Sequence, residues 1–196
     1  KKKEIERLDT AVRLLKVDHR LAQLTVLDQR KAADDGRMLT KFSFVEVGQN
    51  GDPLEQPKVF EIEGNMVHID ALVVSYIDEH VEQGDPLRGA ALCLFRRIYG
   101  DNQKPSEGFP LDAVRSRPAG YSRGSEPTEL ERDIWNRFWD YANDPKMTAE
   151  KGVKNVQGKV AYTQLRKGKS YRLLLRSTGD FTIQPEEGTA PSGKAL

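Results

Sequence analysis

The chain has 196 residues, of which 37% are hydrophobic and 31% are charged, and its net charge is +1 at neutral pH. That length fits one globular domain, or one domain with an extension. No apolar run approaches the roughly 20 residues that a membrane-spanning helix needs. A single cysteine excludes an internal disulfide framework and a multi-cysteine zinc site.

The first 18 residues carry a helical pattern. Four apolar residues follow the a/d spacing of a coiled coil, and only two heptads fit: Ile5, Leu8, Val12 and Leu15. Two interpretations are open, namely a surface helix that packs on its own domain and one end of a longer coiled coil that starts upstream. We expect residues 1–18 to form a helical stalk that binds a protein partner or a second copy of the chain.

Residues 19–185 are expected to form a β-rich globular domain. Apolar and polar residues alternate, as in half-buried strands, over 21–30, 38–47, 58–78, 90–100 and 159–185. Because these strands are not interleaved regularly with helices, a parallel βαβ fold is not expected. The predicted class is α+β, mainly an antiparallel β sandwich or open barrel, with an N-terminal helix and one aromatic-rich helix near 128–143.

Gly64-Asn65 is the clearest turn signal, because this pair suits a two-residue β-hairpin turn. The register of such a hairpin would place Glu61 opposite His68, with Asp70 on the same face. His80 follows one connection later. Carboxylates and imidazoles are ligands for zinc or manganese, so the sequence offers a metal-dependent hydrolase that uses Glu61, His68, Asp70 and His80 as one alternative function.

Two stretches lack a strand or helix pattern. Residues 100–127 contain four prolines and four glycines, and a structureless loop of this length is uncommon in a compact domain. It is either a wrapped functional loop or a short subdomain. The last residues, 186–196, are rich in Pro, Gly, Ser and Ala and are expected to be a flexible tail.

The aromatic-rich helix carries its own start signal. Thr128 followed three residues later by Glu131 matches a capping box. A helix this aromatic is expected to dock on a sheet, and the alternative is a groove for a ligand or partner, since tryptophan is enriched at both. Trp135 and Trp139 are therefore candidate binding residues.

Basic and aromatic residues occur together in two places. Residues 159–176 carry two tyrosines among lysines and arginines, the mixture that single-strand-binding sheets use, and loop residues Arg115, Tyr121 and Arg123 form a second patch. The sequence pI of about 8.0 is lower than the value above 9 that is typical of such domains. A single-stranded nucleic-acid binder is a further alternative, but nucleic acid is not the expected partner.

Charge is segregated along the chain, with acidic residues concentrated in 44–87 and basic residues in 146–176. The two segments either lie side by side or form exposed faces of opposite sign. No nucleophile elbow or phosphate-binding loop is present, and no cofactor is implied. The leading prediction is a non-enzymatic binding or scaffold module.

The layout of a helical stalk followed by a β-rich head resembles bacterial envelope proteins that have an N-terminal anchor, a coiled coil and a β-rich head. The resemblance is architectural and implies a tethered head in the bacterial envelope rather than a cytoplasmic protein. Membrane attachment would come only through sequence upstream of Lys1.

Overall fold

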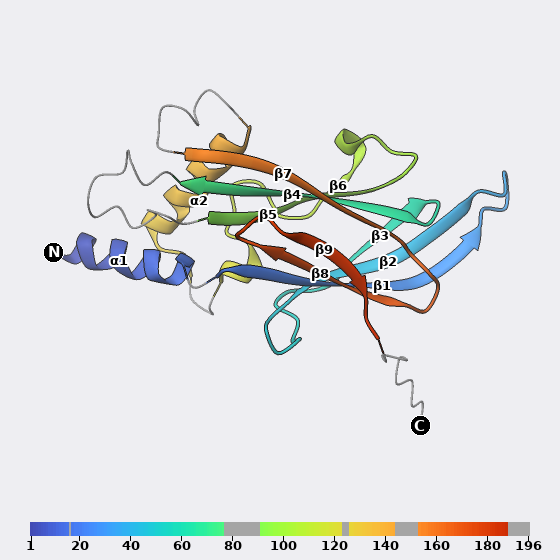
Figure 1. The fold of residues 1–196 in the computed structure, drawn as a ribbon, viewed down its shortest axis with the longest axis horizontal. Coiled ribbons are helices and arrows are strands. Elements are labelled where there is room, and N and C mark those ends of the chain that lie inside the picture. The colour runs from blue at the N-terminus through green and yellow to red at the C-terminus, as the bar shows by residue number, and fades with distance from the viewer. Residues whose placement is uncertain (16, 77–90, 123–125, 144–152, 188–196) are drawn as a thin grey trace.

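The computed structural model describes residues 1–15, 17–76, 91–122, 126–143 and 153–187 (Figure 1). In chain order the elements are α1 (Lys2–Leu15), β1 (His19–Lys31), β2 (Met38–Val47), β3 (Lys58–Glu63), β4 (Met66–Tyr76), β5 (Ala91–Gly100), η1 (Pro105–Glu107), β6 (Phe109–Pro110), η2 (Ala119–Tyr121), α2 (Glu129–Asn143), β7 (Val153–Gln164), β8 (Ser170–Arg176) and β9 (Phe181–Pro185).

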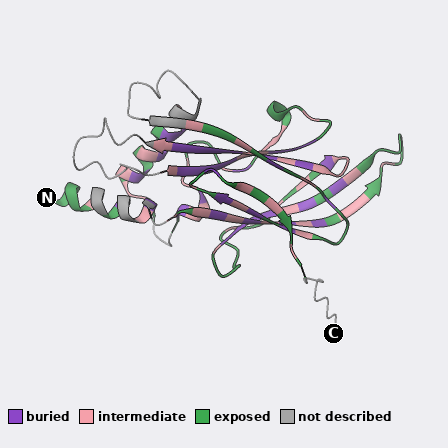
Figure 2. Ribbon diagram, viewed as in Figure 1, coloured by how far each residue is buried: buried purple, intermediate pink, exposed green. Residues whose placement is uncertain are grey.

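The strands form two antiparallel sheets that pack face to face. Sheet A has the order β3-β2-β1-β8-β9, and sheet B has the order β6-β5-β4-β7. Apolar residues from both sheets share one buried core between them (Figure 2). The predicted α+β class is therefore confirmed, and the architecture is a sandwich.

Alternation along the strands builds this core, because successive side chains of a strand point to opposite faces. In β2, Phe42 and Phe44 point between the sheets and are at most 2% exposed. In β5, Cys93 and Phe95 point the same way. The remaining members of the inter-sheet core come mainly from β1, β4 and β8 and include Leu24, Val26, Val67, Ile69, Ala71, Val73, Tyr171, Leu173 and Leu175.

A second core lies on the outer face of sheet B, where α2 covers one end. Leu72 and Val74 of β4 and their neighbours on β5, which alternate with the inter-sheet residues, pack there against α2. The buried side chains of α2 are Trp135, Phe138 and Trp139, each at most 3% exposed. β4 therefore begins half exposed and ends buried on both faces, as its sequence pattern predicts.

The predicted aromatic helix is present as α2. Thr128 precedes its first residue, and the Thr128 hydroxyl accepts the backbone N–H of Glu131 at 3.2 Å. This bond satisfies one of the free N–H groups at the start of the helix. The Glu131 carboxylate instead binds Arg13 and Arg117. Of the two residues of the predicted capping box, Thr128 therefore acts as the cap.

The predicted hairpin at Gly64-Asn65 is wrong. Gly64 has a φ of +81° and makes a tight turn, but β3 belongs to sheet A and β4 to sheet B, so the turn carries the chain from one sheet to the other. β3 pairs with β2, for example Phe60 with Phe42, and β4 pairs with β5 and β7. Alternation correctly indicates that Ile62 and Val67 face inward, but they do so from facing sheets.

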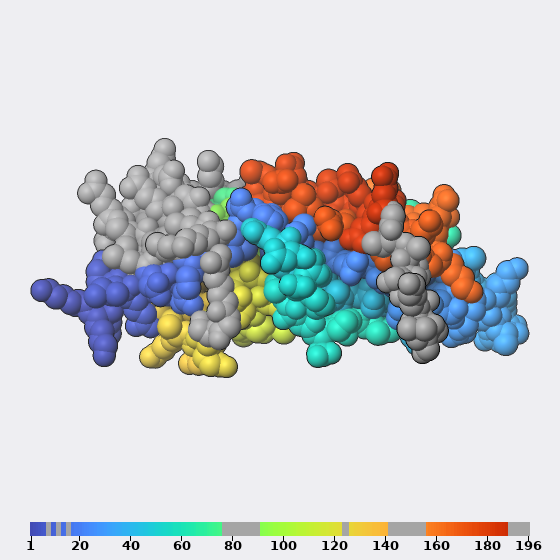
Figure 3. Space-filling view, turned by 90° about the horizontal axis from the view of Figure 1, so that it is seen from below, coloured from blue at the N-terminus to red at the C-terminus, as the bar shows by residue number. Residues whose placement is uncertain are grey.

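The segment between β2 and β3 folds over the outer face of sheet A (Figure 3, cyan). Pro53 forms a bridge with Val47, and the Leu54 N–H donates to the carbonyl oxygen of Glu46 at 2.9 Å. Val45 and Val47 point away from the inter-sheet core, yet both are at most 9% exposed. The loop therefore shields an apolar strip that would otherwise face water.

The described residues of loop 100–127 wrap against the sandwich rather than form a separate subdomain. It contains the short elements η1, β6 and η2, and β6 pairs with the edge of β5. In the part of the chain that the structure describes, no helix is both long and apolar enough to span a bilayer. The proposed tail lies beyond the described residues from position 188 onward.

Truncation of Phe138 tests whether α2 is a structural element of the domain. Phe138→Ala removes a fully buried ring, and we expect the free energy of unfolding to fall by about 3–5 kcal/mol. Arg137→Ala on the exposed side of the same helix is the control and should change it by less than about 0.5 kcal/mol. Urea unfolding measures both, and equal stability of the two variants would contradict the packing described.

Candidate functional site

A buried arginine joins both sheets to loop 100–127. The guanidinium of Arg20 on β1 donates to both carboxylate oxygens of Glu46 on β2, at 2.8 and 2.7 Å. It also donates to both oxygens of Asp112 in the loop, at 2.7 and 2.9 Å, and to the Cys93 carbonyl on β5, at 3.0 Å. These bonds use all five guanidinium N–H groups, and the Arg20 side chain has no exposed surface.

The Arg20 guanidinium of this cluster keeps its proton. Burial alone would lower the pKa of Arg20, but the Asp112 and Glu46 carboxylates raise it well above its ordinary value. The guanidinium also lies 4.5 Å from the ring centroid of Phe95, a cation–π contact. Because every donor of Arg20 is taken by the protein itself, the cluster stabilises the fold and leaves no N–H for a substrate.

Loop 100–127 fits closely against the cluster. Asp112 accepts the backbone N–H of Phe95 at 2.8 Å in addition to its bonds with Arg20. The same loop brings in Gly120, where an added Cβ would collide with the Glu46 carboxylate. A residue without a side chain is therefore required at position 120.

The predicted surface patch of Arg115, Tyr121 and Arg123 is not formed by the described residues. Tyr121 is 4% exposed, and its hydroxyl accepts the backbone N–H of Cys93 at 2.8 Å. Burial raises the pKa of the Tyr121 phenol well above its ordinary value. Arg115 is exposed and pairs with Asp140 on α2 at 2.8 Å, and Arg123 lies outside the described residues.

Glu61 and His68, which the hairpin register would bring together, are on different sheets. The Glu61 carboxylate on β3 lies 3.3 Å from the Arg30 guanidinium on β1, whereas His68 is on β4. Their neighbours Ile62 and Val67 both point into the inter-sheet core. Since successive side chains alternate, Glu61 and His68 project from opposite outer faces of the sandwich.

His68 lies in a row of stacked rings on the outer face of sheet B. Its ring centroid is 5.2 Å from that of Tyr99 on β5 and 5.8 Å from that of Tyr162 on β7. Its Nε2 is 3.4 Å from the Asp101 carboxylate. Asp70 accepts the Tyr99 hydroxyl at 2.9 Å, and burial together with Asp70 raises the pKa of Tyr99 to about 12. The row thus holds His68 and Asp70 at the end of the face that α2 leaves uncovered.

These positions bear on the predicted metal site. Within the described ranges, no three His, Cys, Asp or Glu side chains converge as metal ligands would. Of the four candidates, His68 and Asp70 share a face, Glu61 lies across the sandwich, and His80 lies outside the described residues. The metal-dependent hydrolase stays a prediction.

The single cysteine is in the inter-sheet core. Cys93 is 1% exposed, and burial raises the pKa of its thiol to about 11. The thiolate is the nucleophilic form of cysteine. At neutral pH Cys93 is therefore an unreactive core residue.

Residues 159–176 do not make one aromatic and basic surface. β7 and β8, which this segment supplies, belong to different sheets. Tyr162 is 65% exposed on sheet B, whereas Tyr171 is 2% exposed between the sheets and its hydroxyl accepts the backbone N–H of Arg166 at 2.9 Å. The stacking surface that the nucleic-acid alternative needs is therefore not formed by these two tyrosines.

Trp135 and Trp139, the candidate binding residues of α2, are instead core residues. Their indole N–H groups are buried, and the described residues offer them no hydrogen-bond partner. Trp135 packs against Tyr121, with ring centroids 4.9 Å apart. Neither ring presents a face to a partner.

The last two turns of α1 attach this helix to the domain. Leu14 is part of the core beneath α2, and Thr10 is 1% exposed. The Arg13 guanidinium lies 3.5 Å from the carboxylate of Glu131 on α2, which Arg117 also contacts at 3.2 Å. The first turns of α1 are exposed and extend beyond the sandwich (Figures 1 and 2).

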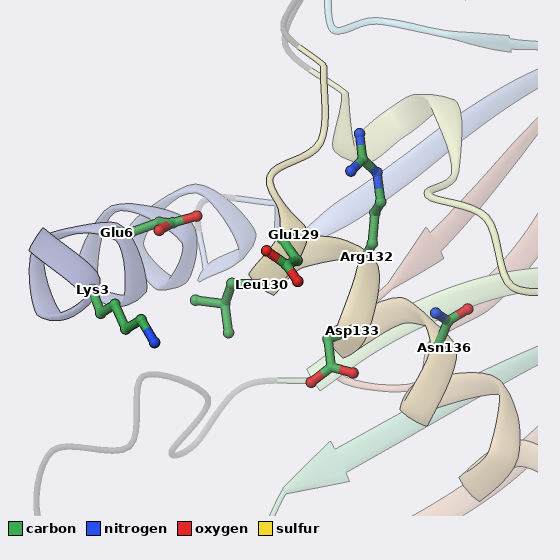
Figure 4. A pocket seen from close by; sticks show the side chains of 7 residues that line it. All are labelled: Lys3, Glu6, Glu129, Leu130, Arg132, Asp133 and Asn136. Carbon is green, nitrogen blue, oxygen red and sulfur yellow. The ribbon is translucent and has the colours of Figure 1, made fainter.

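A hollow of about 540 Å³ lies between the first turns of α1 and the start of α2 (Figure 4). Charged residues of both signs line it, together with one leucine and one amide: Lys3 and Glu6 from α1, and Glu129, Leu130, Arg132, Asp133 and Asn136 from α2. These side chains keep contact with solvent, so the hollow separates the two helices without forming a closed site.

The heptad positions of α1 lie on the side away from α2. Residues advance by about 100° around a helix axis, so the docked residues Thr10, Arg13 and Leu14 share one side with the residues that line the hollow. By the same geometry, positions 5, 8, 12 and 15 are centred about 170° from that side. We call these four positions the heptad face. Ile5 on this face is 68% exposed, and the other three side chains are outside the description.

Comparison of the chain with protein-family models, with curated proteins and with solved structures finds no match.

The sequence analysis did not find the arginine cluster, although the positions of Arg20 and Glu46 in their strands indicate two of its members. Arg20 is in phase with the inward residues Ala22 and Leu24, and Glu46 is in phase with Phe44. A charged residue at an inward strand position calls for a partner of opposite charge. The third member, Asp112, could not be found in this way, because it lies in a loop whose sequence has no strand or helix periodicity.

Arg20→Leu tests the cluster. It leaves the carboxylates of Glu46 and Asp112 buried without their cation, and we expect a loss of about 3–5 kcal/mol in the free energy of unfolding. Arg30→Leu, on the same strand but in a half-exposed pair with Glu61, should cost about 0–1 kcal/mol. Equal losses in urea unfolding would show that the buried cluster does not hold the sheets together.

Glu55, in the loop between β2 and β3, gives a prediction about pH. Burial raises its pKa, Lys58 opposes this, and the Glu46 and Asp112 carboxylates add to it. The folded state then holds the Glu55 proton more tightly than the unfolded state does. Protonation of Glu55 therefore stabilises the fold at low pH, and this stabilisation is lost as pH rises through the folded-state pKa of Glu55.

Glu55→Gln removes this titration. We compare the free energy of unfolding of this variant with that of the unsubstituted protein. The variant's advantage should grow as pH rises from below the ordinary glutamate pKa of about 4.3 to neutral pH, and urea unfolding across that range measures it. The exposed Glu187→Gln is the control. A stability difference for Glu55→Gln that is constant or falls with pH would contradict the assignment.

Proposed function

We propose that this chain is a non-enzymatic binding or scaffold module that engages a protein partner through the heptad face of α1. The observation that carries the proposal is the division of α1 into two sides. Thr10 and Leu14 attach the helix to the domain, while the a/d positions follow the opposite side. A partner helix can therefore dock on α1 without displacing the contacts that hold α1 to its own domain.

The attachment of α1 supports a scaffold role. Arg13 and Glu131 join α1 to α2, and α2 is fixed to sheet B by its buried rings. A partner bound to the heptad face would consequently be held in a defined orientation relative to the sandwich. In the same proposal the sandwich is the head of a longer bacterial envelope protein.

A synthetic helix tests the proposal. The probe is a peptide with isoleucine and leucine at its a and d positions and glutamine at the flanking e and g positions, long enough to be helical alone. Two heptads give marginal association, so binding is followed by NMR shifts at about 1 mM protein. We expect the shifts to be confined to α1.

Ile5→Asp is the variant that removes binding without harming the fold, because the Ile5 side chain is 68% exposed. It should abolish the peptide-induced shifts and leave the melting temperature unchanged. Glu6→Gln, on the hollow side of the same helix, should leave both the peptide-induced shifts and the melting temperature unchanged. The proposal fails if the folded protein shows no shifts with the peptide, or if Ile5→Asp binds it as well as the unsubstituted protein does.

A further inference from the structure

The loop between β2 and β3 contains an asparagine followed directly by a glycine, Asn50-Gly51, and this pair occurs once in the sequence. Both residues are exposed. Residues 48–51 form a tight turn, in which the Gly51 N–H donates to the Gly48 carbonyl oxygen at 2.9 Å. Gly51 has a φ of +81°, which residues with a side chain rarely adopt. The turn therefore places the Asn50 side chain in solvent, next to a backbone nitrogen that no side chain crowds.

The fold does not hold the amide of Asn50. Within the described ranges, no residue forms a hydrogen bond with this side chain. Asn102 in loop 100–127 is also exposed, but its Nδ2 donates to the Glu63 carboxylate at 3.2 Å, and glutamine rather than glycine follows it. Asn50 can thus bring its side-chain carbonyl carbon, Cγ, toward the Gly51 nitrogen, whereas Asn102 has to break a hydrogen bond first.

The Asn50 amide and the Gly51 nitrogen can react with each other. Attack of the nitrogen on Cγ forms an N–Cγ bond and closes a five-membered succinimide ring. The Cγ–Nδ2 bond breaks, and Nδ2 leaves as ammonia with the proton that the Gly51 nitrogen gives up. Solvent water then opens the ring at either carbonyl carbon. The product is aspartate, or isoaspartate, in which the main chain runs through Cβ and Cγ.

Two backbone hydrogen bonds control how often the reacting geometry is reached. The Gly51 nitrogen has to leave the Gly48 carbonyl, and the Gly48 N–H itself donates to the Asp52 carbonyl oxygen at 2.9 Å. Both bonds lie in an exposed turn, and such segments open locally at a small fraction of the free energy of global unfolding. The folded protein can therefore react, but more slowly than an unfolded chain in which neither bond forms.

We propose that Asn50 is a site of spontaneous covalent modification, which converts its amide to a carboxylate and, in the isoaspartate product, lengthens the main chain of the turn by one carbon atom. The modification adds a negative charge to a loop that already contains Asp52 and Glu55. It needs neither an enzyme nor a partner, so its extent increases with the age of the molecule.

The isoaspartate product would loosen the cover that this loop gives to sheet A. The loop is attached to β2 by the Leu54 N–H, which donates to the Glu46 carbonyl oxygen at 2.9 Å. Leu54 follows shortly after Asn50, so an added main-chain atom displaces this attachment. The loop also lines a hollow of about 190 Å³ that reaches Arg20. Release of Leu54 would therefore admit water toward the buried cluster.

Ageing of the folded protein tests the site. The protein is kept at mildly alkaline pH, which favours removal of the proton from the Gly51 nitrogen, and its peptides are then mapped by mass spectrometry. We expect Asn50 to lose its amide at least about fivefold faster than Asn102, whose hydrogen bond to Glu63 has to break first. Aspartate and isoaspartate should both appear at position 50, and the rate should rise further when the chain is unfolded in urea.

Two matched substitutions separate Asn50 from the other asparagines. Asn50→Gln keeps an exposed amide but would have to close a larger ring, so it should remove most of the ammonia that the ageing protein releases. Asn102→Gln makes the same change at the asparagine that Glu63 holds, and it should leave ammonia release unchanged. Because Asn50 is exposed, Asn50→Gln should melt at the temperature of the unsubstituted protein.

Hydrogen exchange tests the effect on the loop. In protein enriched in isoaspartate, the protection of the Leu54 N–H should fall. Freshly prepared Asn50→Asp carries the new charge without the longer main chain, so it should keep this protection.

Three results would overturn the inference. Retention of the Asn50 amide while Asn102 loses its own would exclude Asn50 as the site. Aspartate without isoaspartate would show direct hydrolysis rather than a ring closed by Gly51. Unchanged protection of the Leu54 N–H in the isoaspartate form would show that the loop stays attached to β2.

Discussion

The buried ion cluster around Arg20 is the interaction on which the rest of the structure depends. Moving one such ion from water into a low-dielectric interior carries an idealised cost of about 20 kcal/mol, so Arg20, Glu46 and Asp112 are tolerated there only together. They come from β1, β2 and loop 100–127, and Arg20 also binds a carbonyl of β5. The cluster is therefore complete only when both sheets and the loop are in place, which couples their formation.

Contacts continue from this cluster to the N-terminal helix. The loop that supplies Asp112 also supplies Tyr121, whose ring packs on Trp135 of α2. The first turn of α2 in turn holds α1, through Glu131 and Arg13. The direction in which α1 leaves the domain is thus set by the inter-sheet core. This continuity explains why α1 can act as a fixed arm although its first turns touch little of the sandwich.

Sequence patterns were sufficient for the side each strand buries and for α2, but not for which strands pair. Alternation in β2 and β5 identifies inward residues because one face of each sheet excludes water. The same alternation at Gly64 is compatible with a hairpin or with a change of sheet, since both bury Ile62 and Val67, and that ambiguity produced the wrong neighbour for His68. Three of the candidate site residues are core residues. Tyr121, Trp135 and Trp139 carry the aromatic signal of a binding site, but burial in a core explains it. The a/d spacing of α1 can be recognised in the sequence because it is local, but its use as a binding face stays a prediction.

The position of β1 in the middle of sheet A has a consequence for how the chain folds. One neighbour of β1, β2, follows it at once, but the other is β8, whose pairing joins residues such as Leu21 and Leu174. Contacts this distant in sequence make folding slow. During synthesis one edge of β1 stays without its partner until residues 170–176 have emerged, and an unpaired apolar strand edge is a template for aggregation. Truncation of the chain before residue 170 would leave that edge open permanently.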